Sequence, residues 1–304
     1  MITFSKLGNI GRGNLGNQLF QIASTIGLAK KYNHDFFFPD WKYSSFFENE
    51  LPKGKKDNSY VYLKEKEYNY YEWNLSEGNF DVDGWLQSEK YFDVNTTREI
   101  FNFKKEIIDQ LSHKYNSLFL KKTIVVSVRR GDFVNNPYFF QISYRYYFLA
   151  LIKNFPDWEE RNIIFTSDDI QYCKYHFSFI KNAYFVENLS PIEQLALASK
   201  CDDFIISNST FSWWMAWLGE KENTTIIRPL KNYRGKYALI NNDKDYFPSR
   251  WISFDENEYK IETKYLLLIF RANVYSSIVN VRYFLKFINK KARKFIKKML
   301  LIER

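Results

Sequence analysis

Short β-branched runs alternate with amphipathic segments between residues 121 and 230, and this alternation restricts the folds open to the chain more than any other feature. Apolar residues in the longer segments recur at a spacing near 3.6, which is typical of helices. Strands that alternate with helices predict a parallel sheet with crossover helices, a Rossmann-like unit. The expected strands are 123–128, 162–167, 183–186, 203–207 and 224–228. The expected helices are 142–155, 169–179, 190–200 and 211–219.

The first 120 residues follow a less regular pattern. A strand at 2–7 leads through a turn rich in glycine and asparagine into an amphipathic helix from about Asn17 to Lys31. We expect a boundary near Leu120, before the first strand of the Rossmann-like unit. The chain then divides into an N-terminal domain, a C-terminal Rossmann-like domain and a basic helical tail, with the bounds 1–120, 121–260 and 261–304.

The positive charge of the chain is concentrated at its C-terminal end. The net charge is +9, and residues 264–304 hold eleven Lys or Arg and one acid, a net of +10. The rest of the chain therefore carries 9 minus 10, or about −1. A near-neutral body with a basic tail is not typical of a nucleic-acid-binding groove, and we expect no nucleic-acid partner.

The cysteine content and the N-terminus indicate a cytoplasmic protein. Two cysteines, Cys173 and Cys201, do not make a disulfide framework and favour a reducing compartment. The first residues, MITFSKLGNIGRGN, have neither a basic region nor an apolar region of the secretory type, so we expect no signal peptide.

The stretch VVSVRRGDF (125–133) ends an expected strand with two arginines, a glycine and an aspartate. One interpretation is a surface ion pair between Arg130 and Asp132, which stabilises a protein little. The other is a phosphate site, because a planar guanidinium binds phosphate oxygens in pairs. Side chains alternate along a strand, so we expect Arg129 to enter the cleft and Arg130 to be structural.

Two further segments place polar groups where a helix begins. The turn GRGNLGNQ (11–18) and the segment ISNSTF (206–211) both precede helical patterns. Free N–H groups at a helix N-terminus bind anions or sugar hydroxyls, although both segments also fit a simple turn and helix cap. Three tryptophans follow the second segment, and their spacing favours packing in the core; they are Trp213, Trp214 and Trp217.

Five short blocks occur in a fixed order: GNLGNQLFQIAS, GWLQSEKYF (84–92), VSVRRGDF, FTSDDIQYC (165–173) and ISNSTFSWWMAWL. Together they resemble the bacterial α-1,2-fucosyltransferases, and the resemblance extends from about residue 8 to about Trp251. It implies a GT-B architecture, with two Rossmann-like domains facing a cleft and the donor GDP-β-L-fucose held mainly by the C-terminal one. It also implies inversion at the anomeric carbon without a metal ion or other cofactor.

The resemblance implies roles for particular residues. Arg129 would bind the diphosphate, and Asp202 would read guanine. Ser127 stands where the family usually has histidine, and it could donate a hydrogen bond at shorter reach. The expected catalytic residues are Arg129, Asp132 and Asn17. The expected substrate-binding residues are Gly16, Gln18, Ser127, Arg130, Asp202, Ser209, Thr210 and Phe211.

Some roles stay open at this stage. Asp132 is either a base for the acceptor hydroxyl or a partner of Arg130. The pair Asp168-Asp169 at a strand end either caps the next helix or touches ligand. Asp81-Val82-Asp83 has the form of a metal-binding DxD, but it precedes the Rossmann-like unit, and the histidines and cysteines lack metal-ligand spacing.

The expected reaction is the transfer of L-fucose to O2 of a galactose or similar residue, in surface polysaccharide or lipopolysaccharide assembly. The acceptor would be a galactose-terminated oligosaccharide or a lipid-linked glycan, shaped by the aromatic stretch 40–80 and the loop after Asp132. Two alternatives remain: the same fold using another GDP-deoxyhexose, and a catalytically weak GDP-sugar-binding protein.

The tail has the composition of a helix that lies on a membrane. Apolar residues such as Tyr283, Phe284 and Ile288 recur at helical spacing among lysines and arginines. This pattern predicts binding to an anionic membrane surface, which would make the enzyme peripheral at the inner face of the cytoplasmic membrane. The stretch 265–281 is interrupted by charge and is shorter than the ~20 apolar residues of a membrane span. Packing of the tail on the protein itself is the alternative.

Overall fold

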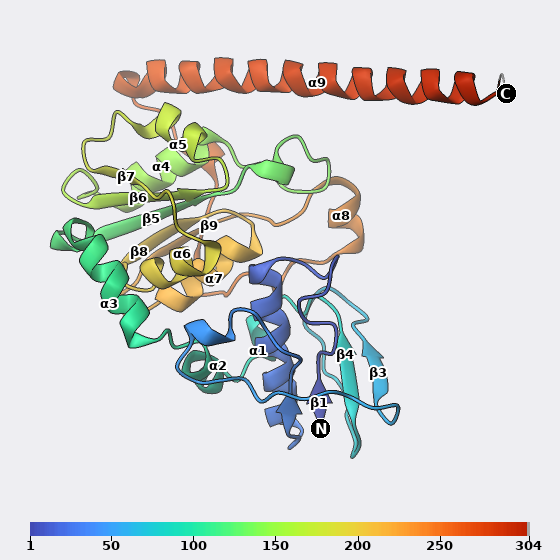
Figure 1. Cartoon of the computed structure of the whole chain (residues 1–304). Helices are drawn as coiled ribbons and strands as arrows, with labels where there is room; N and C mark the ends of the chain where they lie inside the picture. Colours follow the sequence, from blue (N-terminus) through green and yellow to red (C-terminus); the bar gives the residue numbers. More distant parts are fainter. Residues whose placement is uncertain (303–304) are drawn as a thin grey trace.

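The computed structural model describes residues 1–302, with the side chains of 287, 290 and 294–302 left out of the description. Two parallel sheets form two α/β units that lie one above the other in Figure 1. The smaller sheet has the order β2-β1-β4-β3, and its strands are short. They are β1 (Ile2–Thr3), β2 (Phe36–Phe37), β3 (Val61–Lys64) and β4 (Phe80–Asp83).

The larger sheet is built from the second half of the chain, with the order β10-β9-β8-β5-β6-β7. Its strands are β5 (Thr123–Val128), β6 (Asn162–Ser167), β7 (Ala183–Phe185), β8 (Asp203–Ile206), β9 (Ile226–Pro229) and β10 (Ile252–Phe254). The chain winds outward from β5 on one side and from β8 on the other. The carboxyl ends of β5 and β8 therefore meet at the point where the strand order reverses, which is where open α/β sheets bind ligands.

Helices connect the strands and cover the sheets. Those of the first part are α1 (Leu15–Lys31), α2 (Val94–Ile100) and α3 (Lys105–Lys114). Those of the second part are α4 (Tyr144–Asn154), α5 (Ile170–Phe177), α6 (Pro191–Ala198), α7 (Thr210–Gly219), α8 (Gly235–Ile240) and α9 (Leu266–Ile302). Short 3-10 turns complete the order: 44–46, 89–91, 116–120, 131–133, 256–258 and 263–265.

The α/β class predicted from the sequence is confirmed, with two parallel-sheet units facing each other as in a GT-B fold. The five strands and four helices expected between residues 121 and 230 are present with small shifts at their ends. The strand expected at 2–7 ends at Thr3, because the chain turns where the N–H and hydroxyl of Ser5 bind the carboxylate of Asp81. The strands β2, β3, β4 and β10 were not predicted from the sequence. The domain bounds near residues 120 and 260 stay a prediction.

One hydrophobic core runs through both units. Trp213, Trp214 and Trp217 on α7 are fully buried, as their helical spacing predicted. Phe20 of α1 lies 4.5 Å from Trp213 and 5.2 Å from Trp214, measured between ring centres. Phe92 stacks on Trp214 at 5.4 Å. Aromatic side chains bury large apolar areas, so this contact between α1 and α7 holds the two units together.

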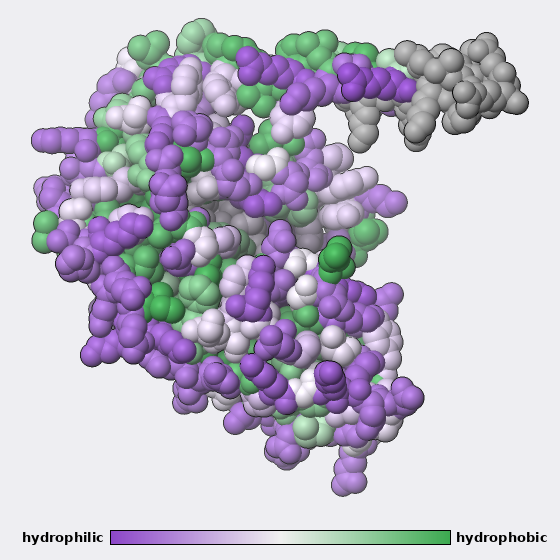
Figure 2. Space-filling view, viewed as in Figure 1, coloured by the Kyte–Doolittle hydropathy of each residue, from purple (hydrophilic) through white to green (hydrophobic). Residues whose placement is uncertain are grey.

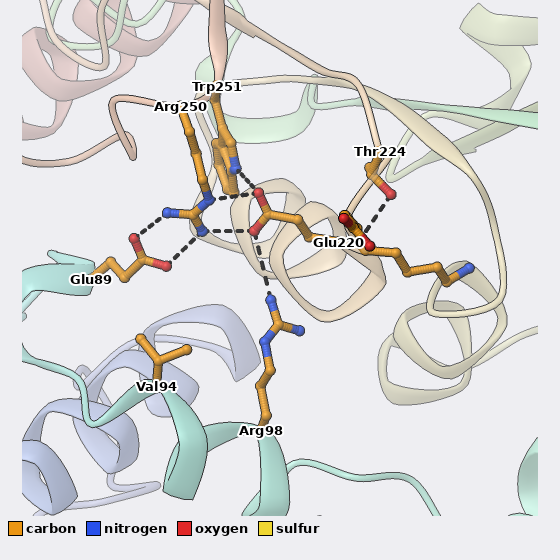
Figure 3. Close-up of a pocket in the computed structure, with 9 residues that line it drawn as sticks. Glu89, Val94, Arg98, Glu220, Thr224, Arg250 and Trp251 are labelled. Atoms are coloured by element: carbon orange, nitrogen blue, oxygen red, sulfur yellow. Dashed lines mark hydrogen bonds and ion pairs between the residues drawn. The ribbon is translucent and has the colours of Figure 1, made fainter.

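Charged side chains join the units at the rim of this core. Arg250 donates to the carboxylates of both Glu89 and Glu220, at 2.6 to 2.7 Å (Figure 3). The indole N–H of Trp251 donates to Glu220 at 3.0 Å, and Arg98 lies 3.7 Å from the same carboxylate. These residues line a cavity of about 710 Å³. Since its charged groups bind one another across the two units, we interpret this cavity as part of their interface.

The last helix, α9, begins against the larger unit and then extends past it (Figure 1). Ile269 and Ala272 are buried against the core of that unit. Across residues 1–302, no helix has the length and apolar character needed to cross a membrane.

Candidate active site

A second cavity of about 790 Å³ opens between the two units at the carboxyl ends of β5 and β8. Nine of the eleven residues expected in the site line it: Gly16, Asn17, Gln18, Ser127, Arg129, Asp132, Ser209, Thr210 and Phe211. Arg130 and Asp202 are not among the lining residues. The strand ends and the helix starts that the sequence singled out therefore meet in one place.

Two helix N-termini converge on this cavity. Asn14 and Leu15 begin α1 from the smaller unit, and Ser209 and Thr210 begin α7 from the larger one. A Cβ at Gly16 would lie 2.6 Å from the backbone nitrogen of Phe211, so only glycine lets the two helix ends approach this closely. Each helix N-terminus carries a partial positive charge and free N–H groups. The cavity is therefore electrostatically suited to an anion.

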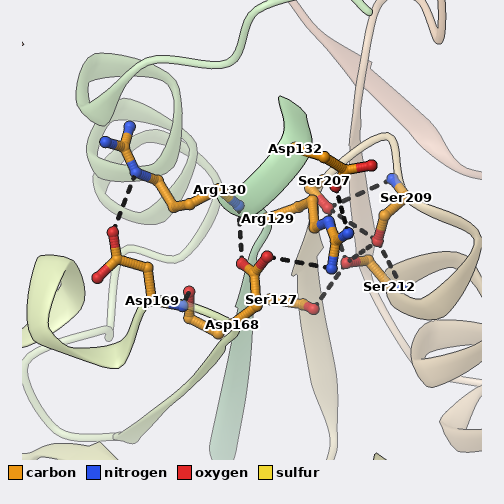
Figure 4. Close-up of polar contacts among 10 residues, drawn as sticks. Ser127, Arg129, Arg130, Asp132, Asp168, Asp169, Ser207, Ser209 and Ser212 are labelled. Atoms are coloured by element: carbon orange, nitrogen blue, oxygen red, sulfur yellow. Dashed lines mark hydrogen bonds and ion pairs between the residues drawn. The ribbon is translucent and has the colours of Figure 1, made fainter. Parts of the chain in front are cut away.

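Arg129 and Arg130 point to opposite sides of the strand end, as alternation predicted (Figure 4). The guanidinium of Arg129 faces the cavity, and its Nε–H is buried with no hydrogen-bond partner among the described side chains. The guanidinium of Arg130 lies 3.9 Å from the ring centre of Tyr172 and 3.7 Å from Asp169. Arg129 thus lies at the wall of the cavity, and Arg130 joins β5 to α5.

Two carboxylates hold Arg129 in place. Asp132 accepts from Nη2 at 2.5 Å, and Asp168 lies 3.1 Å from Nη1 (Figure 4). Asp168 also accepts the backbone N–H of Arg130 at 2.8 Å. The interpretation of Asp132 as a partner of Arg130 is wrong, because the turn at Gly131 directs its side chain to Arg129 instead. A side chain at Gly131 would meet the Asp168 carboxylate, which explains the glycine.

The two acids at the end of β6 have different tasks. Asp169 caps α5 by accepting the N–H of Tyr172 at 3.2 Å. Asp168 lines the cavity, and the sequence left its role open. The guanidinium of Arg129 and the carboxylates of Asp132 and Asp168 thus form a group with one positive and two negative charges. The Asp132 side chain is 67% exposed, so it can turn away from Arg129 when an anion enters.

Four serine hydroxyls form a buried cluster beside Arg129. Ser212 on α7 lies at its centre, with its hydroxyl 2.7 Å from those of Ser127 and Ser207 and 2.9 Å from that of Ser209. Ser127 is therefore bound to α7 rather than left unpaired. The cluster links the ends of β5 and β8 to the first turn of α7 beneath the anion site.

A chain of hydrogen bonds crosses the cavity from one unit to the other. The Gln87 amide donates to Asn17 Oδ1 at 2.8 Å, and the Tyr68 hydroxyl donates to Gln87 Oε1 at 2.7 Å. Asn232 of the larger unit donates to the Tyr68 oxygen at 2.9 Å. Asn17, expected to be catalytic, is thereby fixed in orientation at the N-terminus of α1. Tyr68 and Gln87 were not named as site residues, although each lies in a stretch that the sequence analysis singled out.

The loop after β4 carries Gln87 and is held by a half-buried carboxylate. Glu65 accepts the backbone N–H of Trp85 at 2.7 Å and that of Leu86 at 2.9 Å. Leu86 has a φ of 52°, which is unfavourable for a side chain with a Cβ, and it is fully buried. Burial raises the pKa of Glu65 to about 7, against the effect of the two N–H donors. Glu65 is therefore a positioning residue for Trp85 and Gln87 at the cavity wall.

Asp202 lies at the other end of the larger sheet, before β8 rather than after it. Its carboxylate accepts the N–H and the hydroxyl of Thr123, both at 2.8 Å, where β5 begins. The structure does not bring it to the cavity where it was expected to read guanine. The reason is topological, because residues that precede a parallel strand lie at the amino edge of the sheet.

The two carboxylates of the DxD sequence are bound to cations inside the smaller unit. Asp81 accepts from Lys56 at 2.6 Å, and Asp83 accepts from Lys6 at 2.8 Å and from Arg12 at 2.6 Å. Burial alone would raise the pKa of Asp83, but hydrogen bonds from Lys6 and Tyr62 outweigh it and lower the pKa. Neither acid lines the cavity between the units. Among the residues that the structure describes, no cluster of three or more His, Cys, Asp or Glu could hold a metal ion.

Aromatic rings form another part of the cavity wall, and the Phe133 ring centre lies 5.2 Å from the Arg129 guanidinium. Phe133 and Phe139 stack with ring centres 4.0 Å apart, and Tyr233 and Tyr237 lie beside them. Tyr43 and Tyr68 come from the smaller unit. The irregular stretch 40–80 and the loop after Asp132 thus contribute to the cavity, as the sequence suggested.

The chain belongs to glycosyl transferase family 11, whose family model matches residues 11–255. It is 32% identical over 164 residues to the O-antigen biosynthesis glycosyltransferase WbnK of Escherichia coli, an alignment that covers 49% of this chain and 52% of WbnK. The chain thus spans about half the length of that relative. An alpha-1,2-colitosyltransferase of Escherichia coli is 28% identical over 80% of this chain and 97% of its own length. The Caenorhabditis elegans protein svh-11, named as a galactoside 2-alpha-L-fucosyltransferase, is 25% identical over 78% of this chain and 75% of its own length.

Two solved structures are also similar. The fucosyltransferase NodZ from Bradyrhizobium aligns with 15% identity and a TM-score of 0.47, covering 70% of this chain and 91% of NodZ. POFUT1 in complex with GDP aligns with 13% identity and a TM-score of 0.49, covering 74% of this chain and 97% of POFUT1.

We predict that Arg129→Ala lowers kcat by about 10² to 10³, because it removes a preorganised cation from the site where charge develops. Arg129→Lys recovers little, since a point charge does not reproduce the guanidinium fork. Arg130→Ala is the matched control from the same sequence pair, with its side chain on the other side of the strand. Steady-state kinetics and circular dichroism check the result, and equal losses in the Arg129→Ala and Arg130→Ala variants would contradict the assignment.

The raised pKa of Glu65 predicts opposite pH dependences: activity falls at low pH, whereas the stability that Glu65 contributes falls at high pH. A protonated carboxyl is a poorer acceptor for two N–H groups, so kcat/KM should fall as the pH falls through about 7. Because its pKa is raised, Glu65 contributes most to stability when the pH is below 4.5, its ordinary pKa. This contribution is lost as the pH rises through about 7. Glu65→Gln should flatten both profiles, whereas the exposed neighbour Glu67→Gln should leave them unchanged. Identical profiles for wild type and Glu65→Gln would remove Glu65 from this role.

Proposed function

We propose that this chain is an inverting α-1,2-fucosyltransferase that moves L-fucose from GDP-β-L-fucose to O2 of a galactose or similar residue. The observation that carries the proposal is the convergence of Arg129 and the N-termini of α1 and α7 on one cavity between the units. This arrangement suits a diphosphate, and family membership supports a glycosyl donor. The relatives named for α-1,2 transfer support the linkage.

The chemistry follows from where charge develops. As the bond between fucose and GDP breaks, the diphosphate gains negative charge and the sugar gains oxocarbenium character. Arg129 and the two helix N-termini stabilise the departing diphosphate without any metal ion, because their dipoles and charges are already oriented. The acceptor oxygen attacks the anomeric carbon from the face opposite the leaving group, and the β-linked donor becomes an α-linked product.

Asp132 is our choice for the base that takes the proton from the acceptor hydroxyl. Its carboxylate is exposed at the cavity and lies on the short turn 131–133, which also carries Phe133 of the aromatic wall. Binding of the diphosphate to Arg129 would release Asp132 from its ion pair, and a released carboxylate is a better proton acceptor. Asp168 stays bound to the backbone of Arg130 and positions Arg129.

The acceptor would lie against the aromatic wall. Sugar rings stack their C–H faces on aromatic rings, and Phe133, Phe139 and Tyr233 present such rings beside Asp132. The similarity to an O-antigen enzyme supports an acceptor in surface polysaccharide assembly, free or linked to a lipid, and the name of svh-11 supports a galactose residue in it. We place the reaction in the cytoplasm, consistent with two buried, unpaired cysteines.

A second donor, GDP-colitose, should be compared directly. One relative, which aligns with this chain over 97% of its own length, is named as an alpha-1,2-colitosyltransferase. Colitose differs from fucose by the absence of the hydroxyl at C3. The same cavity would bind either GDP-sugar through the diphosphate, so the choice depends on groups around the sugar ring.

The donor assay tests the proposed function. We expect purified enzyme to release GDP and form product with GDP-fucose and one of lactose, N-acetyllactosamine or a Galβ1,3-linked disaccharide. GDP-colitose, GDP-mannose and GDP-rhamnose serve as competing donors, and NMR of the product identifies the linkage and the anomeric configuration. Turnover of another GDP-sugar but not of GDP-fucose would reassign the donor, and tight GDP binding without turnover would indicate a binding protein.

Activity should persist in excess EDTA, because the proposed charge stabilisation comes from Arg129 and helix N-termini. The Asp81→Asn variant, in which the DxD sequence outside the cavity is changed, should also remain active in EDTA. Loss of turnover on chelation, restored by Mn²⁺ or Mg²⁺, would contradict this mechanism.

A further inference from the structure

The side of α9 that faces away from the body carries a continuous stripe of exposed apolar side chains. Consecutive members are three or four residues apart, which places them on one face of the helix. Their exposed fractions range from 43% to 75%. Figure 2 shows this hydrophobic stripe along the outer edge of α9, with hydrophilic side chains below it. The members are Leu267, Phe270, Val274, Ile278, Val281, Leu285 and Ile288.

The opposite face of the first turns is fixed to the protein. Ile269 and Ala272 are 8% and 3% exposed within the core of the larger unit. Tyr275 packs on His176 with ring centres 4.9 Å apart, and Arg271 donates to the Tyr175 carbonyl. The idea that the tail packs on the protein is therefore correct for these turns. Because they fix the rotation of the helix, they also direct the apolar stripe outward.

The charge of α9 indicates what covers the stripe. Between Leu266 and Ile302 there are nine Lys or Arg and no Asp or Glu. Arg282, Lys286 and Arg293 are exposed beyond the docked turns. A second copy of the helix would bring like charges together without an acid to pair them, whereas coiled coils use opposite charges at these flanks. An anionic lipid surface matches both the apolar stripe and the positive charge.

We propose that α9 lies in the headgroup region of an anionic membrane, with the stripe from Leu267 to Ile288 inserted and the basic side chains among the phosphates. The docked first turns then fix the orientation of the whole enzyme at the surface. This inference goes beyond the proposed reaction and does not depend on it, because it concerns binding to lipid alone.

Vesicle sedimentation tests the inference. Full-length protein should bind vesicles of equimolar phosphatidylcholine and phosphatidylglycerol, bind pure phosphatidylcholine poorly, and be released by salt. The double variant Phe270→Ser/Ile278→Ser should bind at least about tenfold more weakly. The double variant Val61→Ser/Leu120→Ser is the matched control, since both residues are exposed and apolar on the body, and it should bind like wild type.

A second pair of variants tests the charge. Lys286→Glu/Arg293→Glu should weaken binding at least about tenfold, whereas Lys121→Glu/Lys181→Glu on the body should not. Turnover of a soluble acceptor is measured in parallel, so failure of the proposed reaction is distinguished from failure of lipid binding. Equal binding by wild type and the stripe variant would overturn the inference. Absence of lipid binding would also overturn the inference. If light scattering then detected a dimer that the stripe variant abolishes, the stripe would be assigned to contact with a second copy.

Discussion

The contact between α1 and α7 is the constraint on which the site depends. It buries Phe20 against the tryptophans of α7 and brings the first turns of both helices together at Gly16. The helices come from different units, so neither unit alone has the paired N-termini. An apolar contact between two units thus creates a polar property of the cavity beside it, because it brings the N-termini of two helices to the same place.

Around this contact the polar groups form two layers. The buried serine cluster and the carboxylate of Asp168 fix the strand ends and Arg129 from below. The hydrogen-bond chain from Asn17 through Gln87 and Tyr68 to Asn232 crosses from one unit to the other. Preorganisation of this kind lets fixed groups stabilise charge without rearranging during the reaction. The Asp132 side chain is 67% exposed, and in the proposed mechanism it exchanges its ion pair with Arg129 for a proton.

The sequence predicted those parts of the site that depend on local periodicity. Alternation along one strand was enough to separate Arg129 from Arg130, and helical spacing was enough to bury the tryptophans. It failed where a role depends on a distant partner. Nothing near Glu65 in the sequence shows that its carboxylate holds Trp85 and Leu86, and the strands of the smaller sheet are too short to show a period. The prediction for Asp202 was wrong because this residue precedes β8, whereas the cavity lies at the carboxyl ends of the strands.

The shared core also limits how the molecule can open. A hinge between the units would expose the faces of Phe20, Trp213 and Trp214 to water, at a cost of about 1.5 to 3 kcal/mol for a fully exposed ring. It would also break the bonds of Arg250 to Glu89 and Glu220. Wide rotation of one unit against the other is therefore an unfavourable route for loading the donor. The loop from Phe133 to Phe139 is itself tied to the segment 232–237: Arg234 bonds to Tyr138 and Asn136, and Tyr138 stacks on Tyr237. Any widening of the cavity on this side would therefore move both segments as one flap, while the two halves of the molecule stay closed.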